Sequence, residues 1–390
     1  MGTTISKQEK TIDDLPEDIL LNVFLRLSIK TLGFCLCVKK KWLSIIKNPQ
    51  FISLYTTNKT EKIPYSVLWH DFYNWQIFID NDRFDFYKNL YLPDNIYKDD
   101  ASIAVSDGVL CLAKKTGVIV LWNPTIQKTL TLPEPSFGKH LRSEEKYVLG
   151  FAFDSLANDY KVIKIICSKD EQSHQVGVFT LRSKSWKLVS ETNPSYILSG
   201  PALPSINDAL HWLGFSDDNI YPDIVGFDVN AEVFREFKLP NIDVNAEVGG
   251  DFECHHLELW VMKEYGHVES WTKIWTFSGS RHSISSRSFG ARILGLRVKG
   301  EILWQMLSDT SMVPRELELL LPSISTNPES EEEKSVTLFQ IYNGNRYFQE
   351  SLLLLDDTNA VNEDVSSEFS LFRISIYFVI VSQFFIFYQS

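Results

Sequence analysis

The strongest potential metal ligands in this sequence are four consecutive residues, Glu253-Cys254-His255-His256. Carboxylate, thiolate and imidazole groups all bind Zn²⁺ and related ions. Successive side chains of a strand point to opposite faces, so at most two of the four could reach one ion. The polar end of a strand is the favoured interpretation, and no metal site and no cofactor are predicted.

Other spacings typical of enzymes are incomplete. Gly290, Gly295 and Gly300 are spaced as in a phosphate-binding loop, but no Lys-Ser or Lys-Thr pair follows. His211 has no nucleophile signature beside it and is predicted to be a structural histidine. The chain is therefore predicted not to be an enzyme. The alternative is a catalytic cluster whose residues converge only in space.

Composition excludes further classes. The 390 residues are 44% hydrophobic and 23% charged, which argues against general disorder and leaves room for two or three domains. The net charge of −12 disfavours nucleic-acid binding, which needs clustered Lys and Arg, and suits a basic protein partner. The odd number and irregular spacing of the five cysteines predict reduced thiols in the cytosol or nucleus.

The N-terminal region has the pattern of a small helical module. Pro16, Glu17 and Asp18 suit the start of a helix. Apolar residues then recur at helical spacing from Ile19 to Leu27, and a second apolar group leads to Trp42. About forty residues of helix cannot bury this much apolar surface alone, so a partner is expected. The alternative is an amphipathic hairpin packed on its own domain.

The stretch from Leu15 to about Tyr55, which begins LPEDILLNVFLRL and is completed by Trp42, resembles the F-box of plant proteins. The resemblance implies docking to a Skp-type adaptor, and through it to a cullin ubiquitin ligase. Carried over position by position, it implies these adaptor-facing residues: Leu15, Pro16, Ile19, Leu20, Leu27, Leu32, Cys37 and Trp42.

Several positions depart from the F-box pattern. Ser28 stands where Pro is usual, and Gly33-Phe34 replaces a Leu-Arg pair. Lys39 and Lys41 stand where Cys and Ser are common. These departures predict a looser second helix and weaker binding to an adaptor.

From about Tyr65 the spacing of the apolar residues changes from the period of a helix to that of a strand. Short apolar runs such as 118–122 and 162–166 are separated by Gly, Asn, Asp and Pro. A sequence motif, here called the phrase, starts at Asp107-Gly108 and again at Asp208 and at Gly300, so it repeats about every hundred residues. One group of strands of another type lies between successive copies. This predicts a unit of roughly 40–50 residues, the size of a propeller blade, and six blades in all. A β-sandwich is the alternative.

Residues from about Val67 to Asp357 resemble the F-box-associated domain of plant F-box proteins. The resemblance rests on an ordered series that includes LWNPTIQKTLTLP, GFAFDSLANDYKVIKI and FDVNAEVFREFKLP, and ESLLLLDD resembles its closing strand. The phrases Met262–Gly266 and Glu269–Lys273 are similar to the S-locus F-box group, in which pollen receptors recognise basic ribonucleases.

The C-terminal end does not match this pattern. Residues 369–388 form an apolar run of about twenty residues, interrupted by Arg373 and Gln383, which is long enough to cross a bilayer. A membrane anchor that leaves the protein facing the cytosol, a packed strand and an aberrant extension are the alternatives.

The sequence thus predicts a mainly β protein with a small N-terminal α domain, a three-helix F-box followed by a β-propeller-like domain. The expected boundaries are a flexible N-terminus over 1–10, the F-box over 11–56, the β domain over 65–357, and a tail over 358–390 that is apolar from 369. The expected function is substrate recognition in a cullin ubiquitin ligase, in the cytoplasm, the nucleus or both. The alternatives are a propeller interaction module with a degraded F-box and a propeller enzyme.

Overall fold

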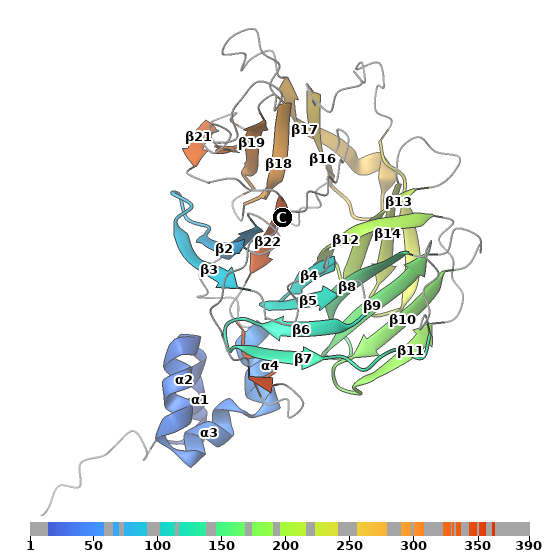
Figure 1. Ribbon diagram of the computed structural model, residues 1–390. Coiled ribbons are helices and arrows are strands. Elements are labelled where there is room, and N and C mark those ends of the chain that lie inside the picture. The colour runs from blue at the N-terminus through green and yellow to red at the C-terminus, as the bar shows by residue number, and fades with distance from the viewer. Residues whose placement is uncertain are drawn as a thin grey trace, which may run out of the picture.

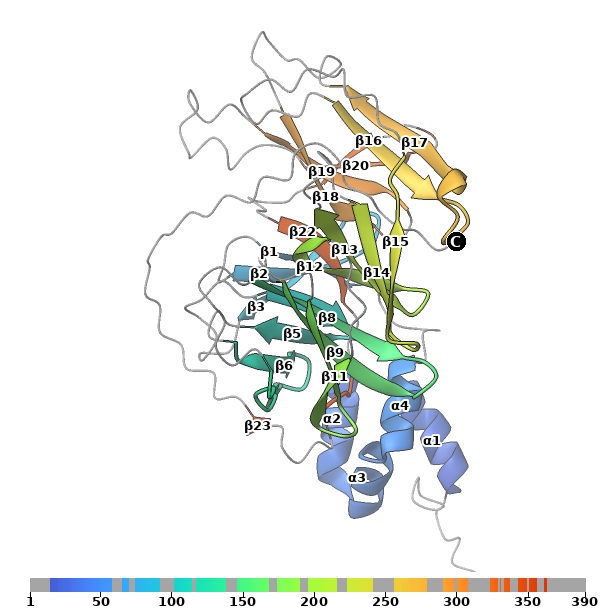
Figure 2. The ribbon, with the colours of Figure 1, turned by 90° about the vertical axis from the view of Figure 1, so that its right-hand side faces the viewer.

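The computed structural model describes residues 15–57, 65–69, 74–91, 102–113, 117–137, 146–167, 174–189, 196–215, 223–240, 256–278, 290–297, 300–307, 323–328, 330, 333–336, 343–348, 351–355 and 361–362. Within these ranges, four helices precede a series of antiparallel sheets arranged around an axis, and the helices lie at one end of the β domain (Figures 1 and 2).

The helical domain has four helices rather than the expected three. They are α1 (Glu17–Leu25), α2 (Ile29–Val38), α3 (Lys40–Ile46) and α4 (Pro49–Thr57). The fourth helix follows from local signals. The Asn48 side chain accepts a hydrogen bond of 2.8 Å from the Gln50 amide, as an N-cap does, and Phe51 and Tyr55 share the buried face.

The described strands form six sheets, in agreement with six blades. Blade 1 consists of β22 (Asn343–Phe348), β1 (Tyr65–Trp69), β2 (Asn74–Ile79) and β3 (Phe86–Tyr91). Blade 2 consists of β4 (Ser102–Ser106), β5 (Val109–Ala113), β6 (Ile119–Asn123), β7 (Lys128–Thr131) and β23 (Val361–Asn362). Blade 3 consists of β8 (Lys146–Asp154), β9 (Asp159–Cys167), β10 (Gln175–Thr180) and β11 (Ser185–Val189).

Blades 4 to 6 follow in chain order. Blade 4 consists of β12 (Ile197–Ile206), β13 (Ala209–Phe215), β14 (Asp223–Asp228) and β15 (Val233–Phe237). Blade 5 consists of β16 (His256–Met262) and β17 (Trp271–Ser278). Blade 6 consists of β18 (Gly290–Leu296), β19 (Ile302–Leu307), β20 (Ser323–Thr326) and β21 (Glu333–Val336).

The repeated sequence phrase marks the first hairpin of every second blade. Asp107 and Gly108 form the two-residue turn between β4 and β5, and Asn207 and Asp208 form the same turn between β12 and β13. All four have positive φ, which matches the tight turn that favours Asn, Asp and Gly. The strand groups between the phrases form blades 3 and 5.

The propeller closes within blade 1. There β22, from the C-terminal part of the chain, pairs antiparallel with β1, so Tyr65 lies opposite Phe348. The closing strand is thus β22, and the ESLLLLDD stretch that was expected to be this strand contains a turn at residues 353–355. Beyond it, β23 pairs with β7 and adds a fifth strand to blade 2.

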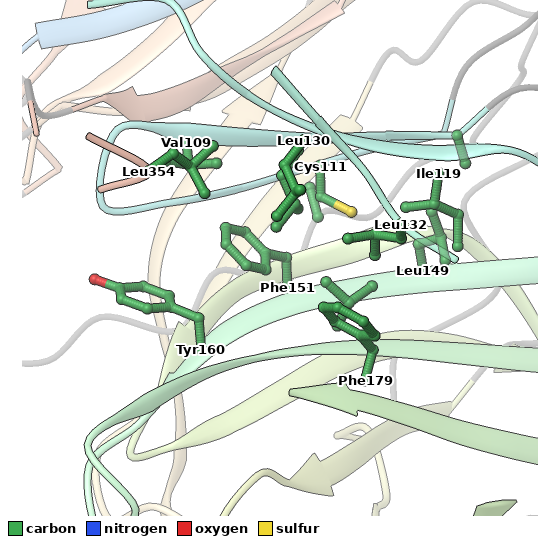
Figure 3. Close-up of a cluster of buried hydrophobic side chains, with 14 of the residues drawn as sticks. Val109, Cys111, Ile119, Leu130, Leu132, Leu149, Phe151, Tyr160, Phe179 and Leu354 are labelled. Carbon is green, nitrogen blue, oxygen red and sulfur yellow. The ribbon is translucent and has the colours of Figure 1, made fainter. Parts of the chain in front are cut away.

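The cores lie between neighbouring blades. One is formed between blades 2 and 3, where Phe151 and Phe179 face Cys111 and Leu130 (Figure 3). A second lies between blades 3 and 4 and contains the fully buried Trp212. Sheets packed face to face around an axis leave few exposed edges, so this arrangement accommodates many short strands.

Residues 369–388, for which a membrane anchor was one of three alternatives, lie outside the described part of the chain. In the part that is described, no helix has the length and apolar character needed to span a bilayer.

Candidate functional site

The first residues of α1, the helix that starts the helical domain, fix the point at which this helix begins. Pro16 has extended backbone and its carbonyl accepts a hydrogen bond of 3.1 Å from the Leu20 amide, so it caps α1 rather than occupying the first turn. Glu17 and Asp18 then lie in the first turn, where the partial positive charge of the helix end favours acidic side chains.

The second helix is capped by Ser28, one of the positions that departs from the F-box pattern. Its hydroxyl accepts a hydrogen bond of 3.2 Å from the Thr31 amide, which satisfies one of the free amides at the start of α2. Serine therefore provides a side-chain cap that Pro could not.

The four helices share one core, which also receives residues of the β domain. Phe24 lies at its centre, edge-on to Trp42 at 5.6 Å and to Phe51 at 6.5 Å between ring centroids. The Tyr55 hydroxyl donates a hydrogen bond of 2.8 Å to the Leu27 carbonyl and ties α4 to the end of α1.

The eight predicted adaptor-facing residues fall into three groups. Leu20 and Leu32 are fully buried in the helical core. The half-buried members pack against that core: Leu15, Leu27 and Trp42. The exposed members are Pro16, Ile19 and Cys37. The fold thus brings these residues into one domain, but it presents only the last group at the surface.

Two exposed apolar stripes run along α1 and α2. Ile19 and Val23 are one turn apart on α1 and are 42% and 43% exposed. Phe34 and Val38 are one turn apart on α2 and are 67% and 57% exposed. Of these four, only Ile19 was predicted. The signal for the others is their position around the helix. Val23 lies beside the buried positions of α1, Leu20 and Phe24, whereas Phe34 and Val38 lie roughly opposite the buried positions of α2, Leu32 and Cys35.

The helical domain packs on one face of the propeller. Ile126, in the turn between β6 and β7, packs against the helical core. The Ser53 hydroxyl of α4 donates a hydrogen bond of 3.3 Å to the Asn158 side chain, in the turn between β8 and β9. Because strands alternate in direction, the connections β5–β6, β9–β10 and β13–β14 lie on the opposite face.

The opposite face carries two exposed apolar residues at the ends of described strands. Val118 precedes β6 and is 38% exposed, and Phe215 ends β13 and is 41% exposed. Nearby, Lys238 forms an ion pair of 2.6 Å with Asp223 and donates a hydrogen bond of 2.9 Å to the Tyr196 hydroxyl.

The residues that could suggest catalysis have packing roles. His211 is fully buried, its Nε2 lies 2.8 Å from the Tyr265 hydroxyl, and burial lowers its pKa to about 4. It therefore stays neutral and structural, as expected. Among the residues described, no group of three or more His, Cys, Asp or Glu could hold a metal ion. Glu253, Cys254 and His255 lie outside them.

The tryptophans expected in the blade cores are mostly buried. Trp122, Trp212 and Trp304 are at most 1% exposed, and Trp271 and Trp275 are 9% and 8% exposed. The turn predicted at Asp154–Tyr160 is also present, since Asp154 accepts a hydrogen bond of 2.8 Å from the Ala157 amide and Asn158 has positive φ.

Comparisons with known families match both domains. The F-box domain matches residues 12–54, and the F-box associated beta propeller domain matches residues 88–313, more than half of the chain.

Relatives over most of the length are F-box proteins of Arabidopsis thaliana. F-box protein CPR1 is 25% identical over 78% of this chain and 82% of its own length. F-box/kelch-repeat protein At3g23880 is 24% identical over 68% of this chain and 80% of its own.

Among solved structures, the WD40 domain of SCAP from fission yeast is 9% identical and has a TM-score of 0.31, covering 70% of this chain and 62% of that one. The Dos1 propeller is 12% identical and also has a TM-score of 0.31, covering 73% and 68%. Scores this low carry no weight, and the assignment rests on the family matches and the six sheets. The chain belongs to the F-box proteins that carry an F-box associated β-propeller domain.

Proposed function

We propose that this protein is a substrate-recognition subunit of a cullin ubiquitin ligase. The observation that carries the proposal is an F-box domain with two exposed apolar stripes, packed on a propeller whose opposite face carries the exposed side chains of Val118 and Phe215. In this proposal the stripes of α1 and α2 contact a Skp-type adaptor, together with Pro16 and Cys37. The core residues Leu20 and Leu32 support the stripes from within.

The chain performs no bond chemistry in this mechanism. It holds a target protein close to a recruited ubiquitin-conjugating enzyme, which raises the effective concentration of the target's lysines. The contacts between the helical domain and blades 2 and 3 hold the two domains in a fixed relation, which a positioning mechanism requires.

We infer that the target binds the propeller face opposite the helical domain. Val118 and Phe215 are exposed apolar side chains there, and large exposed apolar residues are common in protein interfaces. An adaptor on the helical domain and a target on that face could bind at once without collision.

The adaptor proposal is tested with the purified full-length protein and a plant Skp-type adaptor by titration calorimetry. We expect micromolar or tighter binding. Ile19→Asp and Phe34→Asp each place a charge in the exposed stripes and should weaken binding at least tenfold. The matched control is Leu156→Asp, because Leu156 is 83% exposed on the turn between β8 and β9.

Absence of wild-type binding would contradict the adaptor proposal, and the chain would then be an interaction module whose F-box no longer docks. Equal affinity of the wild type and all three variants would show that the stripes do not contact the adaptor.

A narrower proposal is recognition of a basic ribonuclease, as in the S-locus group. The net charge of −12 supports it. The S-locus-like phrases add little, because Tyr265 contacts His211 and Met262 belongs to a buried cluster. Co-precipitation with a basic plant ribonuclease is the test, with a basic protein of another fold as control. Equal binding of both would leave only a charge effect.

The proposed partners act in the cytoplasm and nucleus, and we propose the same location for this protein. The alternative is a membrane anchor formed by residues 369–388. Fractionation of the full-length protein and of a chain ending at residue 368 distinguishes the two, since only an anchored protein would move from membranes to the soluble fraction on deletion.

A further inference from the structure

The segment that follows β22, Ser351–Leu355, lies between the helical domain and the propeller; we call it the closing segment. Its four leucines divide between two cores. Leu352 and Leu355 belong to the helical core, where they are 2% and 8% exposed. Leu353 and Leu354 belong to the core between blades 2 and 3, and Figure 3 shows Leu354 beside Val109.

A tight turn produces this division. The Leu355 amide donates a hydrogen bond of 2.9 Å to the Leu352 carbonyl, and Leu354 has φ of 74°. This is the third position of the turn, where positive φ normally calls for Gly or Asn. A leucine held in such a conformation indicates that packing on both sides fixes the segment.

A buried side chain of blade 2 holds the same turn. Asn123 is fully buried, and its Nδ2 donates hydrogen bonds of 3.0 Å to the Ser351 carbonyl and 2.8 Å to the Leu353 carbonyl. The Leu353 amide in turn donates to the Ser351 hydroxyl at 3.2 Å. The backbone of the closing segment is therefore fixed to the propeller while two of its side chains complete the helical core.

The path of the chain links this contact to closure of the propeller. β22 pairs with β1 and ends at Phe348, so the closing segment begins only a few residues after the strand that closes blade 1. The helices, from the N-terminal end of the chain, thus obtain part of their core from its C-terminal region.

We propose that the F-box of this protein is not self-sufficient, and that its ability to dock depends on the closing segment occupying the helical core. Leu352 and Leu355 are then positioning residues for the exposed stripes on α1 and α2, although neither contacts an adaptor. The binding part of this inference rests on the proposed adaptor function, and the part concerning helix stability does not.

The test compares full-length Leu352→Ala and Leu355→Ala with Leu353→Ala, a matched control in the same turn whose side chain belongs to the propeller core. Amide hydrogen exchange is measured by mass spectrometry, and adaptor affinity by calorimetry. We expect at least tenfold faster exchange in residues 17–57 for Leu352→Ala and Leu355→Ala, with blade 4 unchanged, and at least tenfold weaker adaptor binding. The control should instead accelerate exchange in blades 2 and 3 more than in the helices.

Unchanged exchange in the helices of Leu352→Ala and Leu355→Ala would overturn the inference, as would helix exchange equal to that of the control. If the alanine variants do not fold, Leu352→Met and Leu353→Met give the same comparison with a smaller change of volume. If the wild type binds no adaptor, the proposed function fails, while the exchange data still decide whether the closing segment stabilises the F-box.

Discussion

Arg297 Nε donates a hydrogen bond of 2.9 Å to Asp80 Oδ1, although the two residues lie 217 positions apart in the sequence. The same guanidinium forms an ion pair of 2.6 Å with Glu301 and donates to the Ser325 hydroxyl and the Asn81 carbonyl. Asp80 follows β2 of blade 1, and Arg297 follows β18 of blade 6, so this buried network joins the first blade to the last.

Arg297→Met is expected to destabilise the protein by about 3–5 kcal/mol, because it leaves two buried carboxylates without their cation. Urea unfolding followed by tryptophan fluorescence measures the change. The control is Arg235→Met, which removes an ion pair of 2.8 Å with Asp228 whose arginine is 54% exposed. A surface pair of this kind contributes about 0–1 kcal/mol. Equal losses in the two variants would show that burial does not govern the Arg297 network.

His211 should make the folded state sensitive to acid. Burial lowers its pKa from 6.5 to about 4, so the folded state favours neutral imidazole. Its contribution is fully present above pH 6.5 and is lost as the pH falls from 6.5 towards 4, to a total of about 3 kcal/mol. His211→Phe should flatten this part of the curve of unfolding free energy against pH. An unchanged slope in His211→Phe would contradict the prediction.

Lys164 is a buried cation for which no ion pair exists within the described structure. It is 2% exposed, its Nζ lies 5.0 Å from the Tyr147 ring centroid, and burial lowers its pKa although Glu134 opposes the shift. Below its ordinary pKa the charge therefore weakens the fold. Lys164→Met should stabilise the protein at pH 7 by about 1 kcal/mol or more, and the gain should shrink as the pH rises towards 10.

Lys161 lies on the same strand, and its replacement by Met is expected to change stability in the opposite direction. It is also buried, but it forms ion pairs of 2.7 Å with Asp154 and 2.9 Å with Glu232. Lys161→Met should destabilise by about 3–5 kcal/mol, because it leaves the buried Asp154 carboxylate without its cation and leaves Glu232 with only its exposed partner, Lys187. Thermal unfolding at pH 7 compares the two variants, and destabilisation by both would show that the Lys164 ammonium has a favourable role.

Gly33 lies within α2, and a Cβ added there would meet no atom within 4 Å. Gly33→Ala should stabilise the helical domain by about 0.5–1 kcal/mol, since glycine loses more conformational freedom in a helix than alanine. Hydrogen exchange of residues 29–38 measures the effect. Gly150→Ala should destabilise instead, because its Cβ would lie 2.5 Å from Leu210 Cδ1. Unchanged hydrogen exchange in Gly33→Ala would mean that Gly33 does not limit the stability of α2.

Periodicity in the sequence predicted most of the architecture. The change from helical to strand spacing near Tyr65 and the hundred-residue repeat correspond to the helical domain and to alternate blades. The fourth helix was missed because Asn48 and Pro49 were not read as a helix start. Four leucines in a row could not reveal the closing segment, because their division depends on a turn at Leu354 rather than on any sequence period.

The candidate site was harder to predict for a different reason. An apolar position on a helix can face its own domain or a partner, and the sequence contains the same signal for both. Leu20 and Leu32 are buried within the helical domain, whereas Phe34 and Val38, which were not predicted, are exposed. Only the packing of the helices on one another distinguishes the two groups.

The closing segment also bears on how the protein is made. A ribosome releases α1–α4 first, and the roughly 300 residues between Thr57 and Ser351 take roughly 15–60 s more at ~5–20 residues per second. Over that interval the newborn helices lack Leu352 and Leu355. Truncated mRNAs that end before Ser351 would yield protein fragments that bind the ligase poorly. The ligase would therefore bind full-length receptors in preference to such fragments.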